Sequence, residues 1–240
     1  MNPVTVSHRL LGPVVITPRA ASRNIKARWK QGVVHLSVPL GASARVVSEA
    51  LDSLAPRILA VRPRLDILAP GTVLSLDSVE VRILPPSASF NSGIRYSFSS
   101  SENVPYILTL IPGSSVDPAA GTYPAMMSKV VANALTPVAE SLLIPLGRLH
   151  AERVGRFPVS WRIGRGMRIL GTCSSSRVIT LSRGLLFLPS RLRDYVVCHE
   201  LAHLSEMNHG TRFHQVLESY LPGATALSRE LHHYRWPVLR

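Results

Sequence analysis

The stretch His199-Glu200-Leu-Ala-His203 carries two histidines and a glutamate whose spacing serves a common purpose only if the segment is an α-helix. Residues four apart lie one turn above each other on one helix face, so both imidazoles can approach a single metal ion. Glu200 would lie beside that ion and could accept a proton from water that the metal activates. The spacing therefore predicts a hydrolytic zinc site on a helix.

A buried helix with two core histidines is the other interpretation of these residues. Pro189-Ser190 offers a stop followed by an N-cap. The residues that precede the motif are apolar enough to bury a helix: Leu192, Tyr195, Val196, Val197 and Cys198. In that interpretation, however, Glu200 would be a carboxylate without a role on a half-buried turn, which is unfavourable. We therefore favour the metal-binding helix.

His209 is the candidate for the third ligand, and it requires the helix to end. At 100° per residue, it would lie about 80° from the face of His199 and roughly 15 Å further along an unbroken helix. The helix should therefore break near residues 207–210. Asn208 and Gly210 belong to the residue types that tolerate the left-handed conformation such a break uses.

Glu206 is a competing third ligand. It follows His199 by seven residues and returns to the same helix face, so a His-His-Glu set would need no turn. We favour His199, His203 and His209 as the Zn²⁺ ligands. Glu206 then serves as an outer carboxylate or a surface charge.

The last hundred residues resemble the YgjP-like metallopeptidase domain, a relative of the SprT-like zincins. The resemblance is carried by Gly171-Thr172-Cys173-Ser174-Ser175, Ile179-Thr180-Leu181, Leu188-Pro189, Asp194-Tyr195-Val196-Val197, the segment from His199 to His209, Phe213 and Tyr220-Leu221-Pro222. It implies a zinc-dependent hydrolase with three histidine ligands and Glu200 as the general base. The chain departs from the family pattern at Leu170, Thr172 and Ser182, all outside the zinc motif.

The charge of the chain is strongly positive, and its source is unusual. The net charge is +13, and 24 of the 27 basic residues are Arg. Planar guanidinium groups suit phosphate and carboxylate, so an anionic partner such as a nucleotide or nucleic acid is one interpretation. A solvated surface produced by a general preference for Arg is the other. The densest group is Arg153, Arg156, Arg162, Arg165, Arg168, Arg177 and Arg183. Apart from Phe157 and Trp161, no aromatic residues interleave this group, so specific base recognition is not supported.

Cysteine content and hydropathy predict a reduced, cytoplasmic protein. Cys173 and Cys198 are too few for a disulfide framework. No stretch approaches the 18 or so apolar residues of a membrane helix, and the N-terminus does not resemble a secretory signal. We therefore expect no membrane partner.

The sequence predicts an α+β protein with three parts. Residues 1–115 form a β-rich N-terminal region with one helix, Ser43–Val61, in which Ser43 is the cap and Pro56 bends or divides the helix. Residues 116–122 are a linker. Residues 123–240 form a zincin-like metallopeptidase domain: a long helix, a small sheet, the motif helix and terminal helices.

Within the predicted domain, apolar periodicity gives a helical region from Tyr123 to about Arg153, kinked or divided by Pro137 and Pro145. Short strands are expected at 159–163, 167–170 and 178–181, the last two flanking a turn at 173–176. The edge strand of this sheet should lie beside the cleft, where a peptide substrate could add as another strand.

Several residues after the motif invite secondary roles. His214, His232, His233, Tyr220 and Tyr234 could stabilise an oxyanion, although each alone is better explained as structural. By its position on the next helix, Glu218 is a candidate to orient a ligand histidine.

The leading hypothesis is a zinc metallopeptidase acting on a peptide or protein substrate. A metal-dependent nucleoside triphosphate pyrophosphatase would suit the arginines, but no Gly-rich phosphate cradle appears in the sequence. A non-catalytic zinc-stabilised binding module predicts four protein ligands, whereas three histidines leave one position open. The number of oligomer subunits is not indicated by the sequence.

Overall fold

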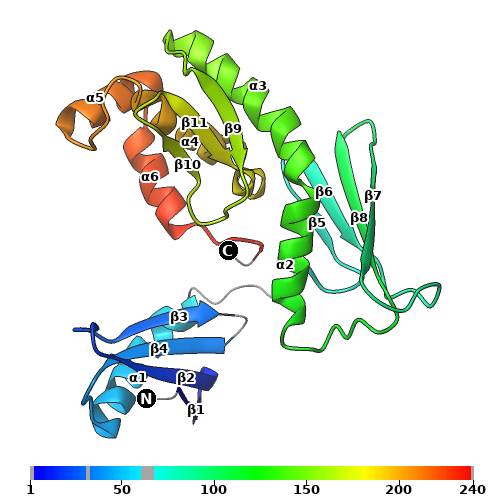
Figure 1. Ribbon diagram of the computed structural model, residues 1–240, viewed down its shortest axis with the longest axis vertical. Coiled ribbons are helices and arrows are strands. Elements are labelled where there is room, and N and C mark those ends of the chain that lie inside the picture. The colour runs from blue at the N-terminus through cyan, green and yellow to red at the C-terminus, as the bar shows by residue number, and fades with distance from the viewer. Residues whose placement is uncertain (1–2, 31–32, 61–67, 239–240) are drawn as a thin grey trace.

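The structure is a computed structural model that describes residues 3–30, 33–60 and 68–238 (Figure 1). Its described part combines three small sheets with six α-helices, which confirms the predicted α+β class. The zincin-like arrangement within that class stays a prediction.

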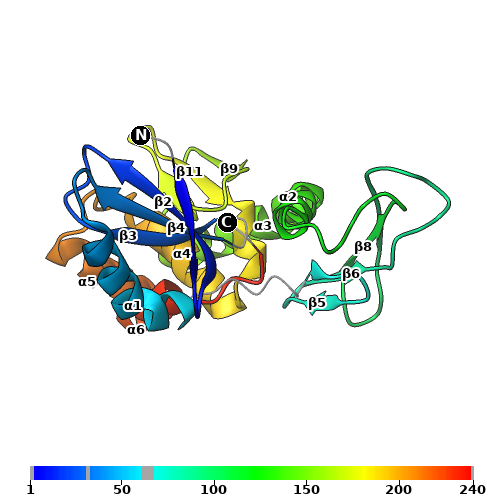
Figure 2. The same cartoon turned by 90° about the horizontal axis from the view of Figure 1, so that it is seen from below.

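A four-stranded sheet covered by one helix forms the N-terminal unit. The elements are β1 (Val4–His8), β2 (Gly12–Arg19), β3 (Lys26–Lys30), β4 (Val33–Pro39) and α1 (Ala44–Ala60). The strand order is β1-β2-β4-β3, with α1 on one face (Figure 2). Alternate residues of β4 are buried against the apolar face of α1, including Leu36 on the strand and Leu51 on the helix. The unit therefore has a hydrophobic core of its own.

The predicted cap of α1 is confirmed, because the Val46 N–H donates to Ser43 Oγ at 3.3 Å. Pro56 lies inside α1 and does not divide it. Val61, the predicted last residue of this helix, lies outside the described residues.

The second sheet contains β5 (Val73–Ser75), β6 (Val79–Ile83), β7 (Ile94–Ser99) and β8 (Tyr106–Pro112) in the order β5-β6-β8-β7. Its buried residues, such as Val81 and Leu108, belong to the same core cluster as Val131 and Ile179, which lie beyond the predicted linker. This sheet therefore packs with the C-terminal half of the chain. The division into domains at 115 and 122 stays a prediction.

Two helices, α2 (Tyr123–Ala134) and α3 (Thr136–Val154), occupy the predicted long helical region and lie between the second and third sheets (Figures 1 and 2). They meet at Leu135 with a bend of 54°. Pro137 sits in the first turn of α3, where its missing N–H costs nothing, while Pro145 is accommodated inside the helix. In the described part of the chain no single helix is long and apolar enough to cross a membrane; the bent pair passes that test by length and composition alone.

The third sheet has the order β10-β11-β9, formed by β9 (Ser160–Gly164), β10 (Gly171–Cys173) and β11 (Val178–Ser182). The predicted strand at 167–170 is wrong, because the antiparallel pairing with β11 begins only at Gly171, opposite Leu181. Leu170 O still accepts the Ser182 N–H at 2.8 Å, but residues 167–170 are not part of a strand. A 3-10 helix (Arg183–Phe187) follows β11 and leads to α4.

The motif helix α4 (Ser190–Ala202) is followed by α5 (Thr211–Tyr220) and α6 (Ala224–His233). Ser190 is not its N-cap as predicted, but its first residue. The cap comes from another part of the chain: Asp77, in the turn between β5 and β6, accepts the Ser190 N–H at 2.6 Å and also the Ser190 hydroxyl. Arg193 Nη2 lies 3.5 Å from the same carboxylate. A residue of the second sheet thus supplies the acceptor that the N-terminus of α4 needs.

Replacing Asp77 with Ala is expected to lower the free energy of unfolding by about 1 kcal/mol at neutral pH, the usual loss for a missing helix cap. Asp77→Asn, which keeps an acceptor, should lose less. The Ser190 hydroxyl lowers the pKa of Asp77, so this contribution is present above its ordinary pKa and is lost as the pH falls through the lowered value. Urea unfolding at pH 7 and pH 3 measures the difference. An equal loss at both pH values would contradict the role of the carboxylate.

Candidate metal centre

The two histidines of α4 lie one turn apart, as the sequence predicts. The ring centroids of His199 and His203 are 4.9 Å apart, and both side chains are largely buried. His203 Nδ1 lies 3.1 Å from the backbone oxygen of Glu206. When Nδ1–H donates to that carbonyl, Nε2 keeps its lone pair for a metal.

The chain brings His209 back to the pair by ending the helix early. Helix α4 stops at Ala202, five residues before the predicted break, and the next turn closes with Ser205 N–H donating to Ala202 O at 3.0 Å. The expectation of a left-handed conformation in this break is also wrong. Among the described residues, neither Asn208 nor Gly210 has a positive φ. The seven residues from His203 to His209 make an ordinary right-handed turn and a bend, which is enough to reverse the chain.

His199, His203 and His209 converge. Their ligand nitrogens all lie within 4.8 Å of one another, and His199 Nε2 is 3.1 Å from His209 Nε2. Two nitrogens bound tetrahedrally to one zinc ion at about 2.05 Å would be about 3.3 Å apart, close to this separation. Burial, reinforced by the neighbouring imidazoles, lowers the pKa of His199 to about 4, and burial also lowers the pKa of His203. Neutral imidazoles are the form that binds a metal, so the donor set fits one.

Phe213 supports all three rings from α5. Its fully buried side chain lies 4.9, 4.6 and 4.8 Å, between ring centroids, from His199, His203 and His209. In the sequence, Phe213 appears only among the residues that carry the family resemblance. Its ring contacts limit how each of the three imidazoles can turn.

Glu206 does not join the cluster. Its carboxylate accepts from Arg212 Nε at 2.8 Å, while its backbone oxygen contacts His203. In the described part of the chain, the group that could hold a metal comprises the three histidines alone. The competing His-His-Glu set is therefore not assembled, nor is the four-ligand site of a closed zinc module.

Glu200 is buried beside the third sheet. Its side chain is 5% exposed, and this burial raises its pKa to about 7. Gly171, the first residue of β10, makes room for it: a Cβ there would lie 2.5 Å from Glu200 Oε1. Gly171 is one of the residues that carry the family resemblance, but its contact with Glu200 was not predicted. That contact depends on how β10 packs on α4, which the spacing of residues in the sequence does not give.

Behind the motif, a partly buried polar network connects α4 to α3. His150 Nε2 lies 3.0 Å from Asp194 Oδ1, and Arg153 Nη2 lies 3.1 Å from His150 Nδ1. The Asp194 carboxylate accepts the Nε2–H, and this bond is the main cause that raises the pKa of His150 to about 9. Arg153 also donates to Cys198 Sγ at 3.4 Å, so this free, buried thiol is part of the contact between the two helices.

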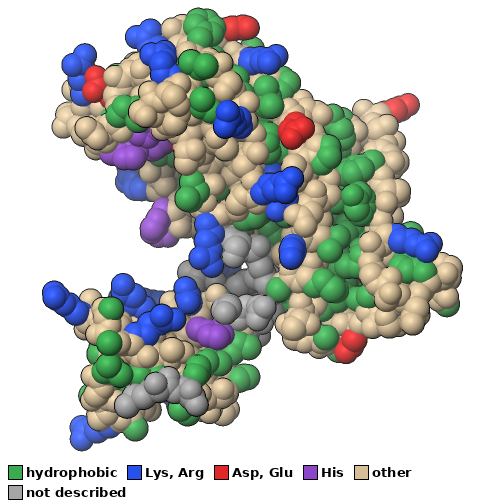
Figure 3. Space-filling model, viewed as in Figure 1, with side chains coloured by type: hydrophobic (Ala, Val, Ile, Leu, Met, Phe, Trp, Pro, Cys, Tyr) green, Lys and Arg blue, Asp and Glu red, His purple; other side chains and the backbone are tan. Residues whose placement is uncertain are grey.

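Among the described residues, the other candidates are not part of the three-histidine cluster. The Tyr234 hydroxyl donates to Phe187 O at 2.7 Å, and Tyr220 Oη lies 3.1 Å from Ser205 Oγ. Glu218 accepts the Gly223 N–H at 2.5 Å and so connects α5 to α6; the suggestion that it orients a histidine is wrong. His214 contacts Phe213, whereas His232 and His233 contact each other on α6. Histidine side chains reach the surface on the side of α5 and α6 (Figure 3).

A family model described as the YgjP-like metallopeptidase domain matches residues 23–234, which is most of the chain. The chain belongs to this family. The resemblance predicted from the motif is thereby confirmed, and the match extends into the N-terminal unit. Membership indicates a metal-dependent hydrolase that acts on peptides or proteins.

A crystal structure of the zymogen of the metallopeptidase abylysin from Pyrococcus abyssi is 23% identical to the chain. The match covers 41% of this YgjP-like chain and 100% of the abylysin chain, with a TM-score of 0.35. No curated protein matches the chain.

Proposed function

We propose that this YgjP-like protein is a zinc-dependent metallopeptidase in which His199, His203 and His209 hold the ion and Glu200 is the general base. One observation carries the proposal: three imidazole nitrogens within 4.8 Å of one another, beside a buried carboxylate whose pKa is raised to about 7. Nitrogen donors from three histidines suit zinc and leave one position for water or substrate. Bound there, zinc would polarise a peptide carbonyl and lower the pKa of water to about 7.

Glu200 moves the proton in this mechanism. Its burial keeps the carboxylate basic near neutral pH, so it can accept a proton from the attacking water and later deliver it to the departing amine. Gly171 and the body of α4 leave this side chain little freedom to turn away.

The open edge of β10 offers a place for an extended peptide. Ser182 N–H donates to Leu170 O, and Ser174 N–H donates to Val178 O. Along β10, every second residue therefore directs its backbone N–H and C=O groups toward β11. This alternation turns the backbone groups of Gly171 and Cys173 away from β11, toward the unpaired edge. A substrate strand added there would run past Glu200, which agrees with the edge binding expected from the sequence.

Metal removal tests the proposal. The full chain is loaded with one equivalent of zinc and assayed on a mixed peptide library by mass spectrometry, then treated with a chelator and reloaded. We expect cleavage that disappears with the metal and returns with it. A panel of nucleoside triphosphates is assayed in parallel. Zinc-dependent turnover of triphosphates without peptide cleavage would replace the proposal by the pyrophosphatase alternative.

Gly171→Ala is expected to reduce kcat by about 10²-fold while zinc content stays unchanged. The added Cβ would displace the Glu200 carboxylate, and displacement of a catalytic group by about 1 Å has an effect of this size. Gly166→Ala is the matched control, because a Cβ at that position meets nothing within 4 Å. Equal rates for the two variants would show that Glu200 does not need its present position.

A further inference from the structure

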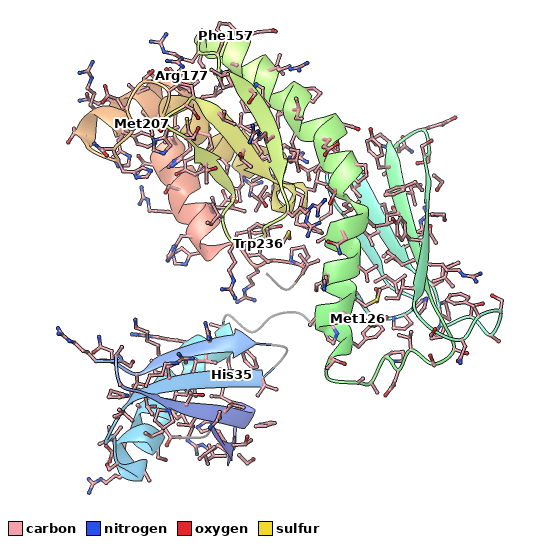
Figure 4. The ribbon with its side chains drawn as sticks, in the orientation of Figure 1. His35, Met126, Phe157, Arg177, Met207 and Trp236 are labelled. Atoms are coloured by element: carbon pink, nitrogen blue, oxygen red, sulfur yellow. The ribbon has the colours of Figure 1, made fainter. Side chains whose placement is uncertain are left out.

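A cavity of about 660 Å³ adjoins the three histidines but is not lined by them. Its wall includes the turn of residues 204–206 that directly follows His203, and Glu206 in that turn holds His203 through its backbone oxygen. The remaining walls come from the segment after α3, the turn before β11 and one side of α5. Phe157 and Arg177 of its lining lie at the same end of the structure as Met207 (Figure 4).

The cavity has an excess of positive charge. Arg156, Arg177 and Arg212 line it, and Glu206 is the only carboxylate among the described residues of its lining. Glu206 pairs with Arg212, while Arg156 Nε donates to Ser205 Oγ at 2.9 Å. Arg177 Nη2 has only a long bond, 3.4 Å, to the Phe157 carbonyl. Two guanidinium groups therefore face the cavity without a carboxylate to neutralise them.

Arg177 has an unfavourable backbone for an arginine. With φ of 59°, it is the one non-glycine residue with positive φ in the described ranges. It closes the turn between β10 and β11, where its N–H donates to Ser174 O at 2.9 Å. Glycine would adopt this conformation without strain. The turn alone therefore does not account for an arginine here, whereas a role for its side chain in the cavity does.

We propose that this cavity binds a carboxylate of the peptide substrate and gives the enzyme a preference for acidic peptides; the proposal rests on the metallopeptidase function proposed above. The carboxylate is either an acidic side chain or the C-terminal carboxylate of the peptide. Planar guanidinium forks match a carboxylate in two parallel hydrogen bonds. The hydroxyls of Ser205 and Tyr220 bond to each other, which leaves one hydroxyl proton of the pair as a further donor. The Arg212–Glu206 pair is a guanidinium–carboxylate contact in the cavity wall, with Arg212 Nε 2.8 Å from a Glu206 carboxylate oxygen. Because the histidines do not line the cavity, the bound carboxylate anchors the peptide and does not react.

Equilibrium binding tests the site without requiring cleavage. The parent is the full chain, zinc-loaded and carrying Glu200→Gln. Three peptides share one sequence and an uncharged dye: neutral with an amidated end, the same with one internal Glu scanned along it, and neutral with a free C-terminal carboxylate. Fluorescence anisotropy gives each dissociation constant. The preferred charged peptide identifies the source of the carboxylate.

Arg177→Gly and Arg156→Gln are the test variants, and Arg177→Gly retains a residue suited to the left-handed turn. Arg229→Gln on α6 removes the same charge from an exposed position outside the lining. The parent should bind one charged peptide about tenfold more tightly than the neutral peptide, as expected for a charge-assisted pair. Both cavity variants should reduce this ratio to below about threefold, and Arg229→Gln should leave it unchanged.

Four results would overturn the proposal: no measurable peptide binding, equal binding of all peptides, a preference that survives both cavity variants, or equal loss in Arg229→Gln. Inorganic phosphate and glutarate are also tested as competitors of the labelled charged peptide. If phosphate displaces the peptide at a lower concentration than glutarate, the cavity is a phosphate site and the proposal is overturned. If the binding preference holds but the wild-type chain, which retains Glu200, cleaves no peptide, only the proposed metallopeptidase function is contradicted. If neutral and acidic peptides are cleaved equally and no preference appears, the cavity proposal fails alone.

Discussion

Glu200→Gln is expected to retain zinc and to lose about 10²–10⁴-fold in kcat for peptide hydrolysis, the usual contribution of a positioned general base. The amide has nearly the shape of the carboxylate, so a side chain that is 5% exposed can be exchanged without opening a cavity. It cannot accept a proton at neutral pH. Zinc content by elemental analysis and initial rates on the best library peptide are the two measurements.

The pH profile separates this role from a structural one. A base acts in its ionised form, so activity falls as the pH drops below its pKa. Burial raises the pKa of Glu200 to about 7, and a nearby cation favours the ionised form and moves it downward. We therefore expect the acidic limb of kcat/KM to have its midpoint at or below about pH 7, and this limb should be absent in Glu200→Gln. Glu206→Gln is the control. Equal rates in wild type and Glu200→Gln would remove Glu200 from the mechanism.

His209→Ala is expected to weaken zinc binding by more than the roughly 10–100-fold that the loss of an outer partner causes, because a direct ligand is removed. Glu206→Ala should weaken it by less than about tenfold. Its carboxylate pairs with Arg212, and the backbone oxygen that contacts His203 is still present in the alanine variant. Competitive zinc titration measures both, with circular dichroism of the apo chains as the check on folding. The reverse order would make Glu206 the third ligand.

Features that follow from helix geometry and from the preferences of single residues were predictable from the sequence. The one-turn relation of His199 and His203 follows from helix geometry, and the cap of α1 at Ser43 follows from a local preference. The need for a chain reversal before His209 also follows from geometry, since an unbroken helix would carry it away. The position and type of that reversal could not be predicted. They depend on the turn hydrogen bonds after Ala202 and on the contact between His203 and Glu206.

Features that depend on distant residues were not predictable. The acceptor for the N-terminus of α4 is Asp77, 113 positions away, and nothing about an Asp in a short turn points to it. The same holds for Gly171, whose pairing with Leu181 makes β10 start four residues after the expected strand start at residue 167. The turn-rich segment after β8 looks like a linker in sequence, yet the core includes Leu108 on one side of it and Val131 on the other.

The contact between Asp77 and Ser190 has a consequence for the order of events during synthesis. At about 5–20 residues per second, the ribosome makes Ser190 roughly 6–23 s after Asp77, long enough for the β5–β6 hairpin and its neighbours to form first. The turn that carries Asp77 is then a template on which the first turn of α4 can dock when it emerges. In a rearranged chain in which the segment with β5–β8 is synthesised last, helix α4 would have to form before its N-terminus can contact Asp77. In vectorial folding, a sheet that is made earlier supplies the contact that the histidine helix needs at its N-terminus.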